Sequence, residues 1–107
     1  MGKYVMIAQS APLPGREAEY DAWYDAVHMR DICTLPGVTG GRRFTATPFA
    51  MPEPGAPRLA IYDIETDDAA AFMAEMGRRS ADGTITRSDA MDRSAAKMWI
   101  YEERPSS

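Results

Sequence analysis

The stretch of sequence that decides the fold runs from residue 16 to residue 48 and reads REAEYDAWYDAVHMRDICTLPGVTGGRRFTATP. Over residues 16–35, aromatic and aliphatic side chains recur three or four positions apart, which predicts a helix with one apolar face. Pro36-Gly37 ends that helix, because the residue before a proline disfavours the helical region. Residues 38–48 then predict a strand with a bulge or bend at its glycine pair.

On either side of this unit the sequence predicts three more strands, over residues 3–10, 58–65 and 96–103, and a second helix over residues 68–77. The resulting β-α-β-β-α-β order is typical of an α+β, ferredoxin-like fold with a four-stranded antiparallel sheet covered on one face by two helices. We expect a single domain spanning residues 1–107. Because the strands carry apolar side chains on both faces, we also expect the uncovered face to meet a second copy in a homodimer.

Bulk composition narrows the classes of function. The 107 residues carry a net charge of −4 and a sequence pI of about 4.9, which argues against a nucleic-acid partner. No apolar run approaches the roughly 20 residues that span a bilayer, so we expect no membrane partner and a cytoplasmic location. With one cysteine and one histidine, the chain is expected to hold no structural metal site.

The single histidine, His28, is the strongest candidate for chemistry. Unrolled as a regular helix, residues 16–35 place His28 and Asp31 on the apolar, aromatic face. Ionisable groups on such a face are costly unless they are paired, and a spacing of three lets them meet. The functional hypothesis makes His28 a general acid or base, Asp31 its orienting partner and Tyr24 a second proton donor. The alternative is a helix-surface pair of His28 and Asp31 with no catalytic role.

Five further residues are candidate ligand contacts. Trp23 either lines a pocket wall or belongs to the core. One of the adjacent arginines, with Arg43 the candidate, is expected to face the helix layer and to pair with a ligand anion or, alternatively, with a protein carboxylate such as Asp31 or Asp63. The remaining candidates for the cleft are Tyr62, Met76 and Trp99. Outside these candidates, Cys33 is expected to be a buried, inert thiol.

Several of these residues form a pattern that is found in a known group of proteins. An aromatic-tyrosine-aspartate run precedes a histidine, and a Pro-Gly break then leads into an arginine-bearing strand; the residues are Trp23-Tyr24-Asp25, His28, Asp31, Leu35-Pro36-Gly37-Val38 and Arg42-Arg43-Phe44. In this pattern the chain resembles the dimeric α/β-barrel superfamily and, within it, the EthD-like group. The resemblance implies a homodimer with a ligand cleft between each sheet and its helices. It also implies that His28 matches the family histidine.

The relatives implied by this resemblance perform several chemistries without a cofactor. Our first functional hypothesis is a cofactor-independent lyase, dehydratase or isomerase that acts on a small aromatic or polyketide-like compound through proton transfer at His28. A cofactor-free monooxygenase in the same cleft is the alternative within enzymes. A non-catalytic protein that binds a hydrophobic metabolite is the alternative outside them. A haem-binding role would require His28 as the axial ligand.

Overall fold

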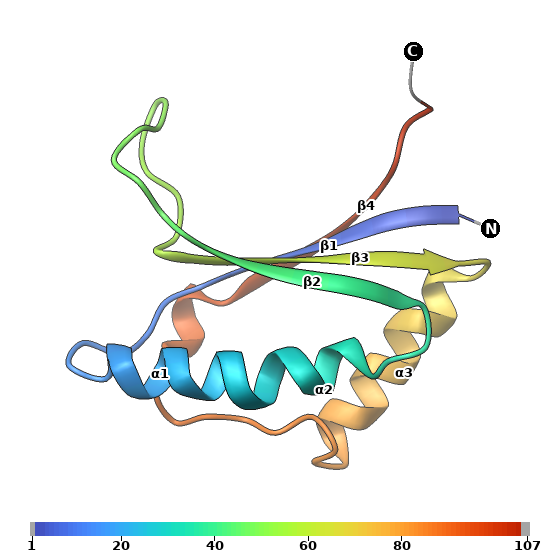
Figure 1. Ribbon diagram of the computed structural model, residues 1–107, viewed down its shortest axis with the longest axis horizontal. Coiled ribbons are helices and arrows are strands. Elements are labelled where there is room, and N and C mark those ends of the chain that lie inside the picture. The colour runs from blue at the N-terminus through green and yellow to red at the C-terminus, as the bar shows by residue number, and fades with distance from the viewer. Residues whose placement is uncertain (1, 106–107) are drawn as a thin grey trace.

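A computed structural model describes residues 2–105 and shows one sheet with helices on a single face (Figure 1). The elements in chain order are β1 (Gly2–Ser10), α1 (Glu17–Trp23), η1 (Tyr24–His28), α2 (Met29–Cys33), β2 (Val38–Thr45), β3 (Arg58–Thr66), α3 (Ala69–Ala81), η2 (Arg93–Ala95) and β4 (Lys97–Glu102). The four strands are arranged in the order β2-β3-β1-β4, and every neighbouring pair is antiparallel. The predicted ferredoxin-like fold is therefore confirmed.

The core lies between the sheet and the helices. Alternate residues of the strands point toward the helices, so that Met6, Tyr62 and Ile64 are all at most 2% exposed. From the helix side, Tyr20 and Leu35 pack against them with equally little exposure. This layer places the aromatic helix directly over the central strands.

The long helix predicted over residues 16–35 contains a π-helical turn, η1, between α1 and α2. In this turn the N–H of Met29 donates to the carbonyl of Tyr24, five residues earlier. Across α1, η1 and α2 together, the inward-facing side chains come every four residues, at Tyr20, Tyr24, His28 and Ile32. In a regular helix each such step overshoots a full turn by about 40°, because successive residues rotate by about 100°. The wider turn absorbs that drift, and Ile32 returns to the buried face with 4% exposure.

Two element boundaries differ clearly from the sequence-based expectation. The second helix continues past Gly77 to Ala81, and Asp68 caps its N-terminus because its carboxylate accepts the N–H of Ala71. The second strand ends at Thr45 rather than at residue 48. The expected irregularity at the glycine pair is present as a register shift between Val38 and Gly40.

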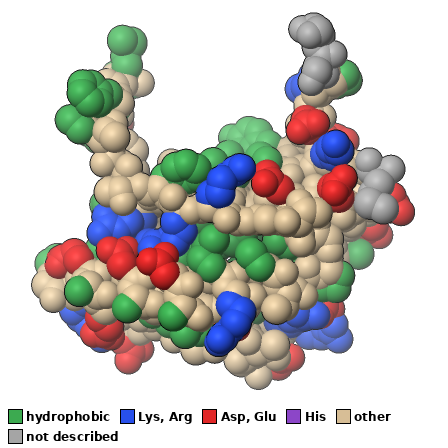
Figure 2. Space-filling model, viewed as in Figure 1, with side chains coloured by type: hydrophobic (Ala, Val, Ile, Leu, Met, Phe, Trp, Pro, Cys, Tyr) green, Lys and Arg blue, Asp and Glu red, His purple; other side chains and the backbone are tan. Residues whose placement is uncertain are grey.

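The opposite face of the sheet has no helix over it. Cross-strand neighbours Ile7, Ile61 and Trp99 lie side by side there, and Trp99 is 42% exposed. The β2–β3 connection and the end of β4 extend away from the helix layer on either side of this face (Figure 1). Apolar side chains are visible on the outside of the molecule between these two extensions (Figure 2).

Candidate functional site

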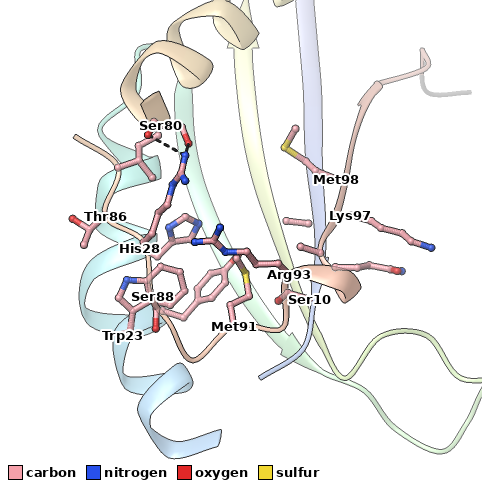
Figure 3. Close-up of a pocket in the computed structure, with 16 residues that line it drawn as sticks. Ser10, Trp23, His28, Ser80, Thr86, Ser88, Met91, Arg93, Lys97 and Met98 are labelled. Carbon is pink, nitrogen blue, oxygen red and sulfur yellow. Dashed lines mark hydrogen bonds between the residues drawn. The ribbon is translucent and has the colours of Figure 1, made fainter. Parts of the chain in front are cut away.

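A cavity of about 390 Å³ opens between the aromatic helix, strands β1 and β4, and the segment that joins α3 to β4. Figure 3 shows His28 and Trp23 on the helix wall, with Met98 on the opposite wall formed by β4. A second cavity of about 310 Å³ shares His28, Tyr24 and Met98 with the first and continues toward the core. The two cavities therefore meet at the only histidine of the chain.

The ring of His28 is held by aromatic contacts on two sides. Trp23 stacks on it at 4.7 Å between ring centroids, and Tyr24 packs with its edge at 4.8 Å. Burial lowers the pKa of His28 below its usual 6.5, and the charge of Asp31 and the backbone of Thr86 oppose this effect only in part. The imidazole is thus neutral at neutral pH.

The nitrogen Nδ1 of His28 is buried and has no hydrogen-bond partner among the described residues. A backbone acceptor that favours the protonated ring must face an N–H, and Nδ1 has no partner, so we assign the contact with Thr86 to Nε2–H. The lone pair of Nδ1 then remains available. Leaving a buried nitrogen of this kind unpaired costs about 1–3 kcal/mol. A ligand or a water molecule that binds to Nδ1 would remove this cost.

Asp31 does not orient His28, which corrects the prediction of a His-Asp pair. Its carboxylate Oδ2 instead accepts the backbone N–H of Thr86 at 3.0 Å. The π-helical turn ends at His28, before the regular turn that carries Asp31, so it turns Asp31 away from the face of Tyr20 but does not change its offset from His28. Asp31 therefore holds the wall segment in place and acts on His28 only through its charge.

Tyr24 is buried beside His28, and its hydroxyl lies 3.4 Å from that of Tyr62, with Tyr62 as donor. Burial raises the pKa of both phenols, so each remains protonated at neutral pH. Tyr24 lines both cavities, whereas Tyr62 and Met76 line the inner one. The structure therefore brings these three predicted residues together with His28 and Trp23.

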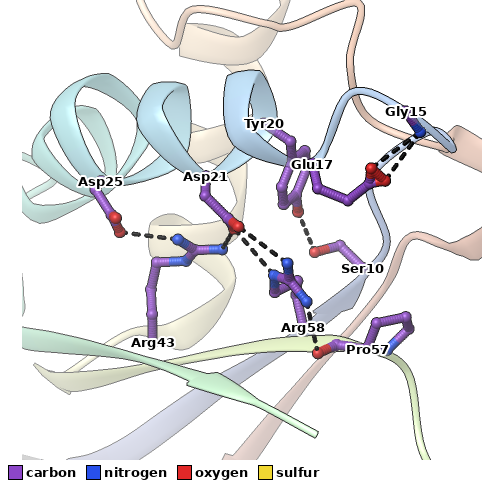
Figure 4. A network of polar contacts seen from close by, with 9 residues as sticks. All are labelled: Ser10, Gly15, Glu17, Tyr20, Asp21, Asp25, Arg43, Pro57 and Arg58. Carbon is purple, nitrogen blue, oxygen red and sulfur yellow. Dashed lines mark hydrogen bonds and ion pairs between the residues drawn. The ribbon is translucent and has the colours of Figure 1, made fainter.

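Arg43 faces the helix layer as expected, but it is held by protein carboxylates and does not line either cavity. It donates to Asp21 at 2.9 Å and to Asp25 at 2.8 Å, while Arg58 binds both oxygens of Asp21 at 2.9 Å (Figure 4). Figure 2 shows these opposite charges meeting between the sheet and the helix. The guanidinium also lies 4.3 Å from the ring centroid of Tyr24. Arg43 thus joins strand β2 to the helix and packs over the ring of Tyr24. This placement corrects the prediction that Arg43 contacts a ligand.

Hydrogen bonds from Arg58 and then Arg43 lower the pKa of Asp21 from 3.8 to about 2. The sequence alone does not indicate a structural role for Asp21 or Asp25, because aspartate side chains on a helix usually face solvent. Their spacing of four, with aromatic residues between them, was the available signal for a shared cation.

Trp99 is placed outside the cleft, on the uncovered face of the sheet, and does not line the cavities that contain His28. Its neighbour Met98 lines both of them, because successive strand residues point to opposite faces. Cys33 is exposed rather than buried, since it follows the buried Ile32 on the outer side of α2. These two placements correct the expectations for Trp99 and Cys33.

Sequence reasoning missed Arg87 and Arg93, which lie in the segment before β4 and line the larger cavity. The signal was present as two arginines in a long polar connection, but nothing in the sequence places that connection over the histidine. Within residues 2–105, no cluster of three or more His, Cys, Asp or Glu side chains is placed to hold a metal ion. No helix of the described chain is long and apolar enough to cross a membrane.

Comparison with known proteins identifies the fold. No protein-family model and no curated protein sequence matches the chain. Among solved structures, it is similar to the haem degrader MhuD from Mycobacterium tuberculosis, with 16% identity, a TM-score of 0.62, and coverage of 97% of this chain and 98% of that one. It is similar to an EthD family protein from Bacillus halodurans, with 15% identity, the same TM-score, and coverage of 97% and 100%. The chain therefore has the ferredoxin-like fold of these proteins, and the predicted EthD-like resemblance is confirmed at the level of the fold.

Proposed function

We propose that this protein binds a small aromatic or polyketide-like molecule in the cavity at His28 and catalyses proton transfer on it without a cofactor, as a lyase, dehydratase or isomerase. The observation that carries this proposal is a neutral imidazole with an unpartnered Nδ1 at the junction of two mostly apolar cavities. A general base needs a neutral form at working pH and a lone pair within reach of the substrate. His28 meets the first requirement, and the proposal requires that the ligand reaches its buried, unpartnered Nδ1 on binding.

The proposed chemistry begins with removal of a proton by Nδ1 of His28 from a carbon next to a carbonyl group. Negative charge then develops on the carbonyl oxygen, where the neutral hydroxyl of Tyr24 can donate a hydrogen bond. The imidazolium, disfavoured by its buried surroundings, returns the proton to another carbon in an isomerisation or to a departing hydroxyl in a dehydration. The protein ends each cycle with its protons unchanged.

Proton removal can be tested with the ketone 2-tetralone in deuterated buffer. We expect the protein to speed the loss of the acidic C–H signals in proton NMR above the rate in buffer. Ligand binding is followed separately by fluorescence in a Trp99→Phe variant, which leaves Trp23 as the single reporter beside His28. Binding at Trp23 without any added exchange would contradict catalysis and favour a protein that only binds. Oxygen uptake with a phenol would instead favour the monooxygenase alternative.

The similar protein MhuD is described with two haems in its active site, so haem is an alternative ligand for the cavity at His28. An axial ligand needs an imidazole nitrogen open to an iron atom at the centre of a wide, flat macrocycle. Here Trp23 stacks on the ring of His28, Tyr24 packs against it, and Nδ1 is buried. These residues do not fit an axial haem ligand, and we expect a haemin titration to give no Soret shift that depends on His28.

We also propose that the uncovered face of the sheet pairs two copies of the chain. Phe44, Trp99 and Tyr101 are 42%, 42% and 57% exposed on this face, which leaves a large apolar area in contact with water. A second copy placed face to face would cover the same residues on both chains.

This pairing predicts that Trp99→Lys converts a dimer into a monomer in analytical ultracentrifugation, with an unchanged circular dichroism spectrum. The matched control is Ala22→Lys, which adds the same charge at an exposed position of α1, on the opposite side of the sheet. It should leave the dimer intact. A wild-type chain that sediments at 11.8 kDa at every concentration would contradict the proposal.

A further inference from the structure

The larger cavity has a cationic opening in an acidic protein. Arg87, Arg93 and Lys97 line it together with His28, and its described lining residues include no aspartate or glutamate. The chain as a whole has 16 acidic and 12 basic residues, so this distribution is opposite to the overall charge. A local concentration of cations of this kind raises the local concentration of anions.

The protein itself does not neutralise these cations. The guanidinium of Arg87 donates to the carbonyl and the hydroxyl of Ser80, which are neutral acceptors, at 3.4 and 3.3 Å. The side chains of Arg93 and Lys97 make no hydrogen bond or ion pair with another residue of the range 2–105. The carboxylate of the neighbouring Asp92 is occupied by the backbone and hydroxyl of Ser94.

The cation-rich part and the apolar part of the cavity are continuous. Figure 3 shows the side chain of Arg93 extending from η2 into the cavity, toward the wall of His28 and Trp23, whereas the side chain of Lys97 points away from it. The inner cavity shares His28 with the larger one and is lined mostly by apolar side chains, among them Met76 and Tyr62. A ligand that fits both parts has an apolar body and a negatively charged end.

We propose that the substrate is an aromatic carboxylate whose carboxylate is bound by Arg87 and Arg93, while its ring lies against Trp23 and His28. Guanidinium groups bind carboxylates through paired, charge-assisted hydrogen bonds, which hold the anion in one orientation. Arg87 can turn from Ser80 to the ligand, because it exchanges neutral acceptors for a charged one. This inference rests on the proposed function of the cavity as a ligand site.

The test compares two probes that differ in charge, 2-naphthoate and its neutral amide 2-naphthamide, by Trp23 fluorescence in the Trp99→Phe background. We expect 2-naphthoate to bind at least about tenfold more tightly than the amide, as expected for one or two charge-assisted hydrogen bonds. Its advantage should shrink as salt is raised from 50 to 500 mM. In the double variant Arg87→Gln/Arg93→Gln the advantage should disappear while binding of the amide persists.

Two control variants keep the outcomes distinct. Arg30→Gln removes a positive charge from an exposed position outside the cavity and should leave both affinities unchanged. Arg93→Lys keeps the charge but loses the planar fork, and should give an intermediate affinity. Equal binding of both probes would overturn the anion preference but leave the cavity as a ligand site. Absence of any Trp23 response to either probe would overturn the proposed function as well.

Discussion

Replacement of His28 by asparagine is expected to lower turnover of a substrate by about 10²–10⁴-fold, the usual contribution of a general base. Asparagine keeps a polar group near the position of Nδ1 but cannot accept and return a proton. Ligand affinity, read from Trp23 fluorescence, should change by only a few-fold because the remaining cavity wall is intact. The split between turnover and affinity separates a lost base from a damaged pocket.

The matched control is Asp31→Asn. In a His-Asp pair this substitution would reduce turnover strongly, as loss of the orienting carboxylate does in catalytic triads. Here the carboxylate accepts the N–H of Thr86, which an asparagine oxygen can also accept, so turnover at pH 7 should stay within about threefold of wild type. A loss equal to that of His28→Asn would contradict our placement of Asp31.

The acid limb of the pH–rate profile provides a second readout of the same group. Because burial lowers the pKa of His28, the basic form dominates above that value and is lost as the pH falls through it. The midpoint of the acid limb should therefore lie below pH 6.5. A midpoint above pH 6.5 would mean that a different group is the base.

The second large effect is on stability. Asp21→Asn is expected to lower the free energy of unfolding by about 2–3 kcal/mol at pH 7, because it leaves Arg43 and Arg58 without their shared carboxylate. Their side chains are only 15% and 17% exposed, so water replaces the lost partner poorly. Urea denaturation of the wild type and the variant measures this difference.

Asp25→Asn is the matched control, since Asp25 binds Arg43 alone and is 68% exposed. Its cost should be below about 1 kcal/mol, as for other exposed ion pairs. If the two variants were equally stable, Asp21 would not be the centre of the network. This comparison does not depend on the proposed function.

The same network has a defined pH dependence. The pKa of Asp21 falls from 3.8 to about 2 on folding, so its stabilisation is fully present above pH 4 and is lost as the pH falls through 2. A third of the side chain is exposed, and solvent screening reduces the pH-dependent part to about 1–2 kcal/mol. The stability gap between wild type and Asp21→Asn should therefore narrow between pH 4 and pH 2.

The order of strands and helices was predictable because each element has its own periodicity and its own end signal. Pro36-Gly37 ended the first helix region, and Asp68 capped the second. The antiparallel pairing then followed from the β-α-β-β-α-β order. These are local properties, and local properties can be read from one chain.

The details of the site depended on features that local patterns do not contain. A π-helical turn at Tyr24–His28 changed which side chains share a face with Tyr20, and the carboxylate of Asp31 binds the backbone of Thr86 rather than His28. The choice of partner for Arg43 depended on how far the helix lies from the sheet. The cations Arg87 and Arg93 reach the cavity only through the path of a long connection, which periodicity does not specify.

The central claim, that His28 is a neutral base with a free Nδ1, is tested most directly by nitrogen-15 NMR of the imidazole. The chain has one histidine, so a tag-free sample gives a single, unambiguous set of ring signals. We expect a neutral ring at pH 7, protonated on Nε2 and not on Nδ1, that titrates below pH 6.5. A ring that carries its proton on Nδ1, or that titrates above pH 6.5, would contradict the account.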